Sequence, residues 1–272
     1  MKKYSNIYEA LVERIRFEER NAKNPDKAAK TRLHQMYGAY VQPNINKKAM
    51  ALIEKIICSA RTRLDLRDIS DSNAACRTSP PPADMNIIRL LKLHASTNER
   101  LPYYSDFYDF IFSQTGMTDK VLDLGCGFNP FSLPFFPKQP SEYHAIDIDI
   151  HTKDLLNAFF AFKRLPEYAT CEDLVSVTPT VKVDLALMLK LIPVLEANKP
   201  GRAYNLANEL NTAWLVVTFP TKSLGGKIKG MATNYRAGFC CALKNKSLSN
   251  FSLVAENSIQ NELVFVLKHK NQ

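Results

Sequence analysis

The stretch that decides the fold is Val121-Leu122-Asp123-Leu124-Gly125-Cys126-Gly127. It reads as a short apolar strand that contains one acidic residue and ends in Gly-x-Gly. In an open α/β sheet, ligands bind beyond the carboxyl ends of the strands, near the point where the strand order reverses. Gly125 and Gly127 let the backbone approach a ligand and adopt dihedral angles that a Cβ atom would forbid. The stretch therefore predicts a ligand site, although a Gly-x-Gly alone is also compatible with a plain tight turn.

Short apolar runs alternate with helical patterns on both sides of this stretch. The predicted strands are 120–124, 142–148, 168–171, 183–189, 214–219, 251–256 and 262–267. Strands joined by helical crossovers, followed by two strands with little between them, predict a mostly parallel, doubly wound α/β sheet with a C-terminal antiparallel hairpin. We therefore expect residues 83–272 to form one Rossmann-like domain.

The turn after the first strand departs from the dinucleotide-binding pattern. A full Gly-x-Gly-x-x-Gly is absent, because Gly127 is followed by Phe128-Asn129-Pro130. The missing third glycine argues against NAD. It favours S-adenosyl-L-methionine, the cofactor of the class I methyltransferase variant of this sheet.

Acidic residues follow the next two strands. Asp147 ends the second strand, where a carboxylate is placed to accept both ribose hydroxyls of a nucleoside cofactor. Asp149 is better placed to cap the next helix. Glu172 and Asp173 follow the third strand, where the amino group of an adenine would find its acceptor. Each acid alone is also compatible with a surface cap, but acids at three successive strand ends favour the cofactor site.

The first 82 residues read as amphipathic helices that carry most of the excess positive charge of the chain. Helical spacing of apolar residues predicts helices over 4–20, 25–40 and 47–59, and the Ser- and Pro-rich segment 70–83 reads as a linker. A basic helical region is typical of a phosphate-binding face, with an ordinary solvated surface as the alternative. The candidate RNA-binding residues of this region are Lys2, Lys3, Lys27, Lys30, Arg32, Lys47, Lys48, Arg61, Arg63 and Arg67.

The composition of the 272-residue chain limits its class. A hydrophobic content of 46% with a net charge of +9 is typical of a soluble protein that is attracted to polyanions. Its apolar runs are too short to span a bilayer, and no apolar signal-peptide core follows Met1. The six cysteines are scattered without zinc-like spacing. We expect a cytoplasmic protein with free thiols and no metal, and a monomer.

Two missing motifs limit the atom that could be methylated. An exocyclic amine usually requires an Asn/Asp-Pro-Pro-aromatic run after the fourth strand, but residues 188–193 read Met-Leu-Lys-Leu-Ile-Pro. Carbon-5 of a pyrimidine requires a nucleophilic cysteine, typically beside proline, and the chain has no such pair. A ring nitrogen with a free lone pair needs neither device, so positioning alone, worth up to ~7–11 kcal/mol, can supply the catalysis. We therefore expect no general base, and Lys190 and Tyr235 are the candidates to lie near the reacting atoms.

The most specific motif precedes the sheet. Residues 93–100, Leu-His-Ala-Ser-Thr-Asn-Glu-Arg, resemble the HxSTxER signature of the Arm/Rmt family, the aminoglycoside-resistance methyltransferases of 16S ribosomal RNA. Matching segments follow in the same order over nearly the whole chain: 31–34, 38–40, 123–130, 184–196, 219–226, 230–231 and 234–235.

The resemblance implies methylation at N7 of guanosine 1405 of 16S ribosomal RNA within the assembled 30S subunit, which would block aminoglycoside binding. It implies S-adenosyl-L-methionine as the cofactor, with Arg100 on the cofactor carboxylate. The cofactor-binding residues are then His94, Ser96, Thr97, Arg100, Gly125, Cys126, Gly127, Asp147, Glu172, Asp173 and Lys190. The RNA-binding residues of the C-terminal half are Lys222, Lys227, Lys229, Met231 and Asn234.

Two other functions stay open on the sequence. One is a methyltransferase that acts on another nucleotide, such as an adenine ring nitrogen of the decoding site, or on a small molecule. The other is a non-catalytic RNA-binding protein with a degenerate Rossmann domain. The basic N-terminal region argues against a small substrate, and the presence of Gly125, Gly127 and Asp147 argues against a degenerate cofactor site.

Overall fold

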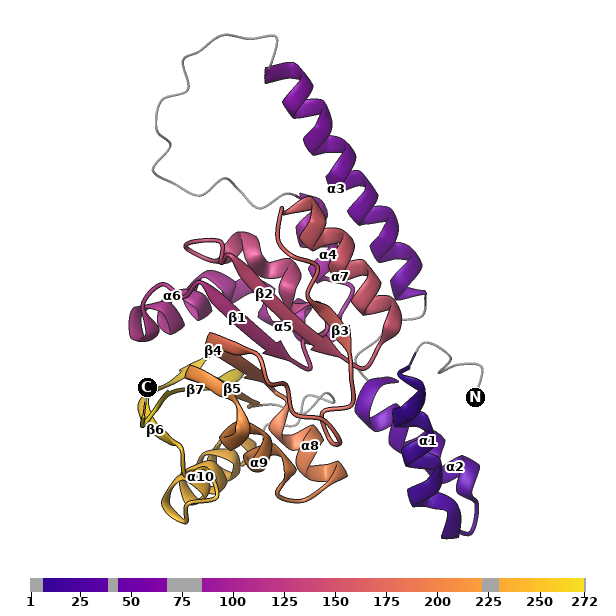
Figure 1. Cartoon of the computed structure of the whole chain (residues 1–272), viewed down its shortest axis with the longest axis vertical. Helices are drawn as coiled ribbons and strands as arrows, with labels where there is room; N and C mark the ends of the chain where they lie inside the picture. Colours follow the sequence, from indigo (N-terminus) through magenta and orange to yellow (C-terminus); the bar gives the residue numbers. More distant parts are fainter. Residues whose placement is uncertain (1–6, 39–43, 68–84, 222–229, 272) are drawn as a thin grey trace.

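A computed structural model describes residues 7–38, 44–67, 85–221 and 230–271. Its centre is a seven-stranded sheet of order β3-β2-β1-β4-β5-β7-β6 (Figure 1). The strands are β1 (Lys120–Leu124), β2 (Glu142–Asp147), β3 (Ala169–Cys171), β4 (Lys182–Leu189), β5 (Asn211–Pro220), β6 (Phe251–Ile259) and β7 (Glu262–His269). Strands β1 to β5 are parallel, and β7 lies antiparallel between β5 and β6. The predicted fold class is confirmed, and the strand order reverses between β1 and β4.

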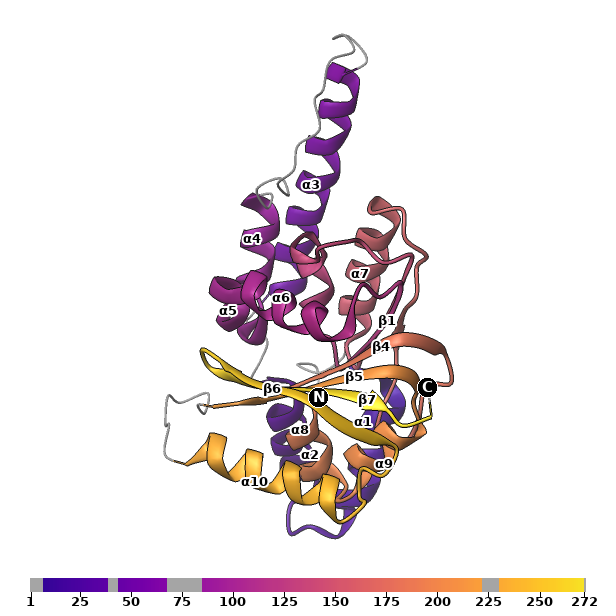
Figure 2. The ribbon, with the colours of Figure 1, turned by 90° about the vertical axis from the view of Figure 1, so that its left-hand side faces the viewer.

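Helices cover both faces of the sheet (Figure 2). One face carries α3 (Ile45–Arg67), α4 (Met85–Leu91), α5 (Ala95–Arg100), α6 (Tyr104–Thr115) and α7 (Ile150–Phe162). The other carries α8 (Ile192–Asn198), α9 (Arg202–Glu209) and α10 (Met231–Lys244). Successive strand residues point to opposite faces, so Val121 packs in the first layer while Leu122 and Leu124 pack in the second. No described helix is both long and apolar enough to cross a membrane.

The chain begins with a separate helix pair. It consists of α1 (Glu9–Glu18), the 3₁₀ turn η2 (Glu19–Asn21), α2 (Pro25–Leu33) and the π-helical turn η3 (His34–Gly38). The side chain of Asn24 caps α2, and Pro25 fits its first position because that residue needs no N–H bond there. Buried residues of the pair, among them Leu11 and Leu33, form a small cluster that packs against Ile148, directly after β2.

Three predicted helix bounds were wrong. The predicted helix 4–20 begins only at Glu9, because Ile7 forms a β-bridge with Asp149. The predicted helix 25–40 leaves α-helical geometry after Leu33 and continues as the π-helical turn. The predicted helix 47–59 begins at Ile45 and continues to Arg67, because Ala, Arg and Leu keep a high helix propensity where no apolar stripe is present. The apolar residues of α3, from Ile45 to Ile56, lie in one core with α4 and the sheet. The predicted linker 70–83 and the domain boundary at 82/83 lie outside the described residues and stay predictions.

Candidate functional site

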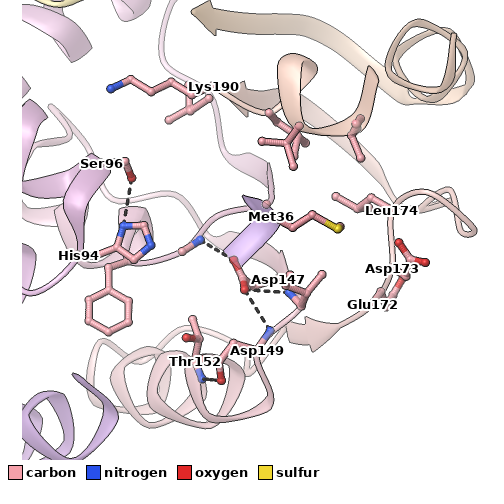
Figure 3. Close-up of a pocket in the computed structure, with 18 of the residues that line it drawn as sticks. Met36, His94, Ser96, Asp147, Asp149, Thr152, Glu172, Asp173, Leu174 and Lys190 are labelled. Carbon is pink, nitrogen blue, oxygen red and sulfur yellow. Dashed lines mark hydrogen bonds between the residues drawn. The ribbon is translucent and has the colours of Figure 1, made fainter. Parts of the chain in front are cut away.

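A cavity opens beyond the carboxyl ends of β1, β2, β3 and β4 (Figure 3). Its empty space is about 960 Å³, including open solvent at the mouth. Its wall comes from the turn after β1, the loops after β2 and β3, the end of β4, and the first turn of α8. The position matches the predicted ligand site at the reversal of strand order.

Asp147 lies at the centre of this wall (Figure 3). Its Oδ2 accepts the N–H of Gly127 at 2.8 Å, and its Oδ1 accepts the N–H of Ile148 at 2.8 Å and of Asp149 at 3.1 Å. Burial raises the pKa of Asp147 to about 6, although these hydrogen bonds oppose the rise. Asp149 instead caps α7 by accepting the N–H of His151 and of Thr152, which confirms its predicted role as a helix cap.

The Gly-x-Gly turn is tightly enclosed. Gly125 and Gly127 have φ of +63° and +51°, which L side chains rarely adopt. A Cβ on Gly125 would lie 2.8 Å from Cδ1 of Leu191, and one on Gly127 would lie 3.0 Å from the ring of His94. Cys126 between them is buried, and its N–H donates to the carbonyl of Ile146 at 3.0 Å. This backbone hydrogen bond connects the turn to β2, and Cys126 does not line the cavity.

His94 and Ser96 line the cavity opposite this turn. Nδ1 of His94 lies 3.1 Å from Oγ of Ser96. Burial, followed by the positive charges of Arg100 and Lys190, lowers the pKa of His94 to about 4. Thr97 is buried behind them, where its hydroxyl donates to the carbonyls of Leu91 and His94, and it does not line the cavity.

Arg100 is 1% exposed and lies behind the cavity wall. Its Nε and one terminal nitrogen donate to the carboxylate of Glu262 at 2.9 and 2.6 Å, and the other terminal nitrogen donates to Oδ1 of Asn129 at 3.1 Å. The guanidinium is thus satisfied within the protein. Arg100 is not among the residues that line the cavity, so its predicted contact with a cofactor carboxylate stays a prediction.

Lys190 follows β4 and lines the cavity with φ of +58°. Its N–H donates to the carbonyl and to the hydroxyl oxygen of Thr218, at 3.1 and 3.0 Å, and that hydroxyl donates to Glu262. Its Nζ binds Glu99 at 2.7 Å. A non-glycine residue held in the left-handed region costs about 1–3 kcal/mol, and such strain clusters at functional sites.

Glu172 and Asp173 line the far end of the cavity, opposite His94 (Figure 3). The carboxylate of Asp173 is buried, and Nε of Arg14 from α1 donates to it at 2.7 Å. Met36 of η3 also reaches into the cavity at this end. The helix pair therefore contributes to the site, which no local sequence signal indicated.

The predicted RNA-binding residues have different surroundings. Lys27, Lys30, Lys47 and Lys48 are exposed. Arg32 is half-buried and binds Glu18, Glu19 and Asn198, so its guanidinium already has partners. Arg61, Arg63 and Arg67 lie on α3, in a segment whose side chains are not described. Lys2, Lys3, Lys222, Lys227 and Lys229 lie outside the described residues.

The N-terminal part of α10 carries the remaining candidates. Asn234 is exposed and Met231 is half-buried. The ring of Tyr235 stacks on Phe219 with centroids 5.0 Å apart, and Tyr235 does not line the cavity. Sequence reasoning missed the apolar lining of the cavity, which includes Phe128, Leu174 and Leu191. Each of these three directly follows a residue that was predicted to bind the cofactor, namely Gly127, Asp173 or Lys190. This adjacency was the available signal.

Known proteins resemble the chain along nearly its whole length. The family described as FmrO, ribosomal RNA methyltransferase, matches residues 3–266. A 16S rRNA (guanine(1405)-N(7))-methyltransferase of Serratia marcescens is 34% identical over 98% of this chain and 94% of its own. One of Micromonospora echinospora is 30% identical over 90% and 83%.

The solved structures agree with this likeness. RmtF, a 16S rRNA methyltransferase in complex with S-adenosyl-L-homocysteine, superposes with a TM-score of 0.79 at 30% identity, covering 98% of this chain and 93% of its own. RmtB, a 16S rRNA methylase, superposes with a TM-score of 0.77 at 29% identity, covering 99% and 94%. The predicted resemblance and the class I methyltransferase fold are confirmed, and the chain belongs to the FmrO family of ribosomal RNA methyltransferases.

Proposed function

We propose that this chain transfers a methyl group from S-adenosyl-L-methionine to N7 of guanosine 1405 of 16S ribosomal RNA, within the assembled 30S subunit. The observation that carries the proposal is the cavity at the reversal of strand order, with the Asp147 carboxylate fixed beside the Gly125–Gly127 turn. It lies in a chain that matches methyltransferases named for this nucleotide over 90% to 98% of its length.

The residues around the cavity fit a nucleoside cofactor. Both carboxylate oxygens of Asp147 are oriented by backbone N–H groups, which leaves about one of its four lone-pair sites, on Oδ2, to accept a ribose hydroxyl. The backbone of Gly127 lies so close to the ring of His94 that a Cβ would be 3.0 Å from it, so only glycine fits this part of the wall. Glu172 and the apolar Leu174 and Val175 are placed to hold the adenine. When bound, the cofactor supplies a methyl group on a positively charged sulfur.

The proposed methyl transfer to N7 requires no proton transfer by a side chain of the protein. Guanine N7 is an acceptor with a free lone pair, so attack on the methyl group releases no proton from the base. Burial lowers the pKa of His94 to about 4, so at pH 7 the side chain is a neutral imidazole and does not serve as an imidazolium acid. The task left to the protein is to hold the two reactants in line, worth up to ~7–11 kcal/mol. Lys190, fixed at the cavity edge by Thr218 and Glu99, and Tyr235 on α10 are our candidates for positioning the base.

The exposed lysines Lys27, Lys30, Lys47 and Lys48 are the proposed contacts to ribosomal RNA phosphates. The remaining candidates of the helix pair, of α3 and of the 222–234 region would extend this surface. A methyl group and positive charge on N7 of guanosine 1405 would block aminoglycosides at the decoding site, so we propose resistance to these drugs as the consequence.

The test is transfer of labelled methyl from S-adenosyl-L-methionine to purified 30S subunits, with 50S subunits and naked 16S RNA as parallel substrates. We expect label in 30S particles, little in naked 16S RNA and none in 50S subunits. Label in naked RNA at the rate of 30S particles would contradict the requirement for the assembled subunit. No transfer to any RNA, with cofactor binding intact, would favour the non-catalytic alternative.

A further inference from the structure

The helix pair α1–α2 touches both acidic loops of the cofactor cavity. The N–H of Tyr8 donates to the carbonyl of Ile148 at 2.8 Å, and Ile7 forms a β-bridge with Asp149. These backbone contacts hold the loop that carries Asp147. Arg14, farther along α1, reaches the loop after β3 and binds Asp173 with two nitrogens, at 2.7 and 3.4 Å.

Asp173 organises the loop after β3. It is 3% exposed, and its carboxylate accepts the N–H of Val175 at 3.0 Å and the hydroxyl of Ser176 at 3.1 Å. A buried carboxylate requires a charged partner, because its desolvation is otherwise uncompensated. The side chain of Arg14, 17% exposed, is that partner. The position of the loop therefore depends on an arginine 159 residues away in sequence.

Further contacts extend from Arg14 to the end of α8. Glu18 joins Arg14 to Arg32, with distances of 2.7 and 2.6 Å. Arg32 in turn donates to the side chain and the carbonyl of Asn198, at the end of α8, at 3.0 Å each. Val194 and Leu195 of α8 line the cavity, so the two arginines connect α1 and α2 to a helix that forms part of its wall.

We propose that Arg14 is a positioning residue of the cofactor site, and that the helix pair supports the two acidic loops of that site as well as carrying exposed lysines toward RNA. The inference rests on the proposed cofactor. It assigns to one helix pair both a share of cofactor affinity and a share of docking.

The test compares Arg14→Ala with Arg16→Ala in the full-length chain. Arg16 lies on the same helix but is exposed, which makes it a matched control for helix propensity and net charge. The dissociation constant of S-adenosyl-L-homocysteine is measured by calorimetry and folding by thermal melting. We expect Arg14→Ala to bind roughly tenfold more weakly, while Arg16→Ala matches wild type. Methyl transfer to 30S particles should show a raised KM for the cofactor with little change in kcat.

Arg14→Lys should recover part of the affinity, because its ammonium restores the charge but not the two-nitrogen contact. If Arg14→Ala melts below the assay temperature, Arg14→Gln against Arg16→Gln gives the same comparison. A folded Arg14 variant with wild-type affinity would overturn the inference. Failure of wild type to bind S-adenosyl-L-homocysteine would instead overturn the proposed function.

Discussion

The carboxylate of Asp147 is oriented without help from any ligand. Three backbone N–H groups fix it, two from its own loop and one from Gly127. Because its orientation is already fixed, ribose binding need not restrict that side chain further, and hydrogen bonds to a charged group contribute about 1.5–3 kcal/mol. Burial raises its pKa to about 6, so this residue also connects cofactor affinity with pH.

Replacement of Asp147 by Asn is expected to weaken cofactor binding by roughly 10- to 150-fold, the equivalent of about 1.5–3 kcal/mol. The amide removes the charge and points a donor at the N–H of Gly127 or at the ribose. Calorimetry with S-adenosyl-L-homocysteine measures the change. Asp154→Asn, a change to an exposed acid on α7, is the control and should bind as wild type does. If the Asp147→Asn variant is folded and binds normally, Asp147 does not belong to the cofactor site.

The affinity of the wild type should also fall as the pH falls. The cofactor hydroxyls need the ionised carboxylate, so binding is strongest above the pKa and is lost below about pH 6, approaching tenfold per pH unit. Dissociation constants measured from pH 5 to pH 8 test this. Asp147→Asn should lack this dependence; if it keeps the dependence, another group causes it, such as Asp123, whose pKa burial also raises to about 6.

At the scale of elements, the strands were predictable and several contacts between elements were not. Short runs of β-branched and apolar residues bounded by turn signals located the strands within a few residues. Helix α3 continued eight residues past Ser59 because helix propensity sufficed without an apolar stripe. Arg14 and Asp173 meet only when α1 packs beside the loop after β3, which local sequence does not encode.

Exposed lysines on α2 are expected to act in docking and not in cofactor binding. Lys27→Gln with Lys30→Gln should weaken 30S binding and flatten its salt dependence by roughly 0.7–0.9 in log–log slope for each phosphate that is no longer neutralised. Cofactor affinity should stay at the wild-type value. Lys138→Gln is the control, because Lys138 is exposed in the segment before β2, at the amino ends of the strands. Equal salt slopes for the α2 variant and wild type would show that these lysines are only solvated.

At the scale of the whole molecule, the sheet and the glycine-containing and acidic parts of the cavity wall followed from the sequence. Gly125, Gly127, Asp147, Glu172 and Lys190 all line the predicted cavity, since strand ends at one edge of a parallel sheet must meet. The surroundings of Arg100 could not be predicted, because its partner Glu262 lies 162 residues away on an antiparallel strand. Thr97 and Cys126 are buried behind the wall and do not line the cavity. Sequence alone does not distinguish a residue that lines a cavity from one that supports its wall.

The most direct test of the central claim is to identify the methylated atom. Purified 30S subunits are incubated with the protein and S-adenosyl-L-methionine, and fragments of their 16S RNA are analysed by mass spectrometry at nucleoside resolution. A parallel sample carries 7-deazaguanosine at position 1405, which lacks the nucleophilic nitrogen. We predict 7-methylguanosine at position 1405 in the unmodified subunits and no methyl transfer to the deaza sample. Methylation at another nucleotide, at an adenine ring nitrogen, or in the deaza subunits would contradict the account.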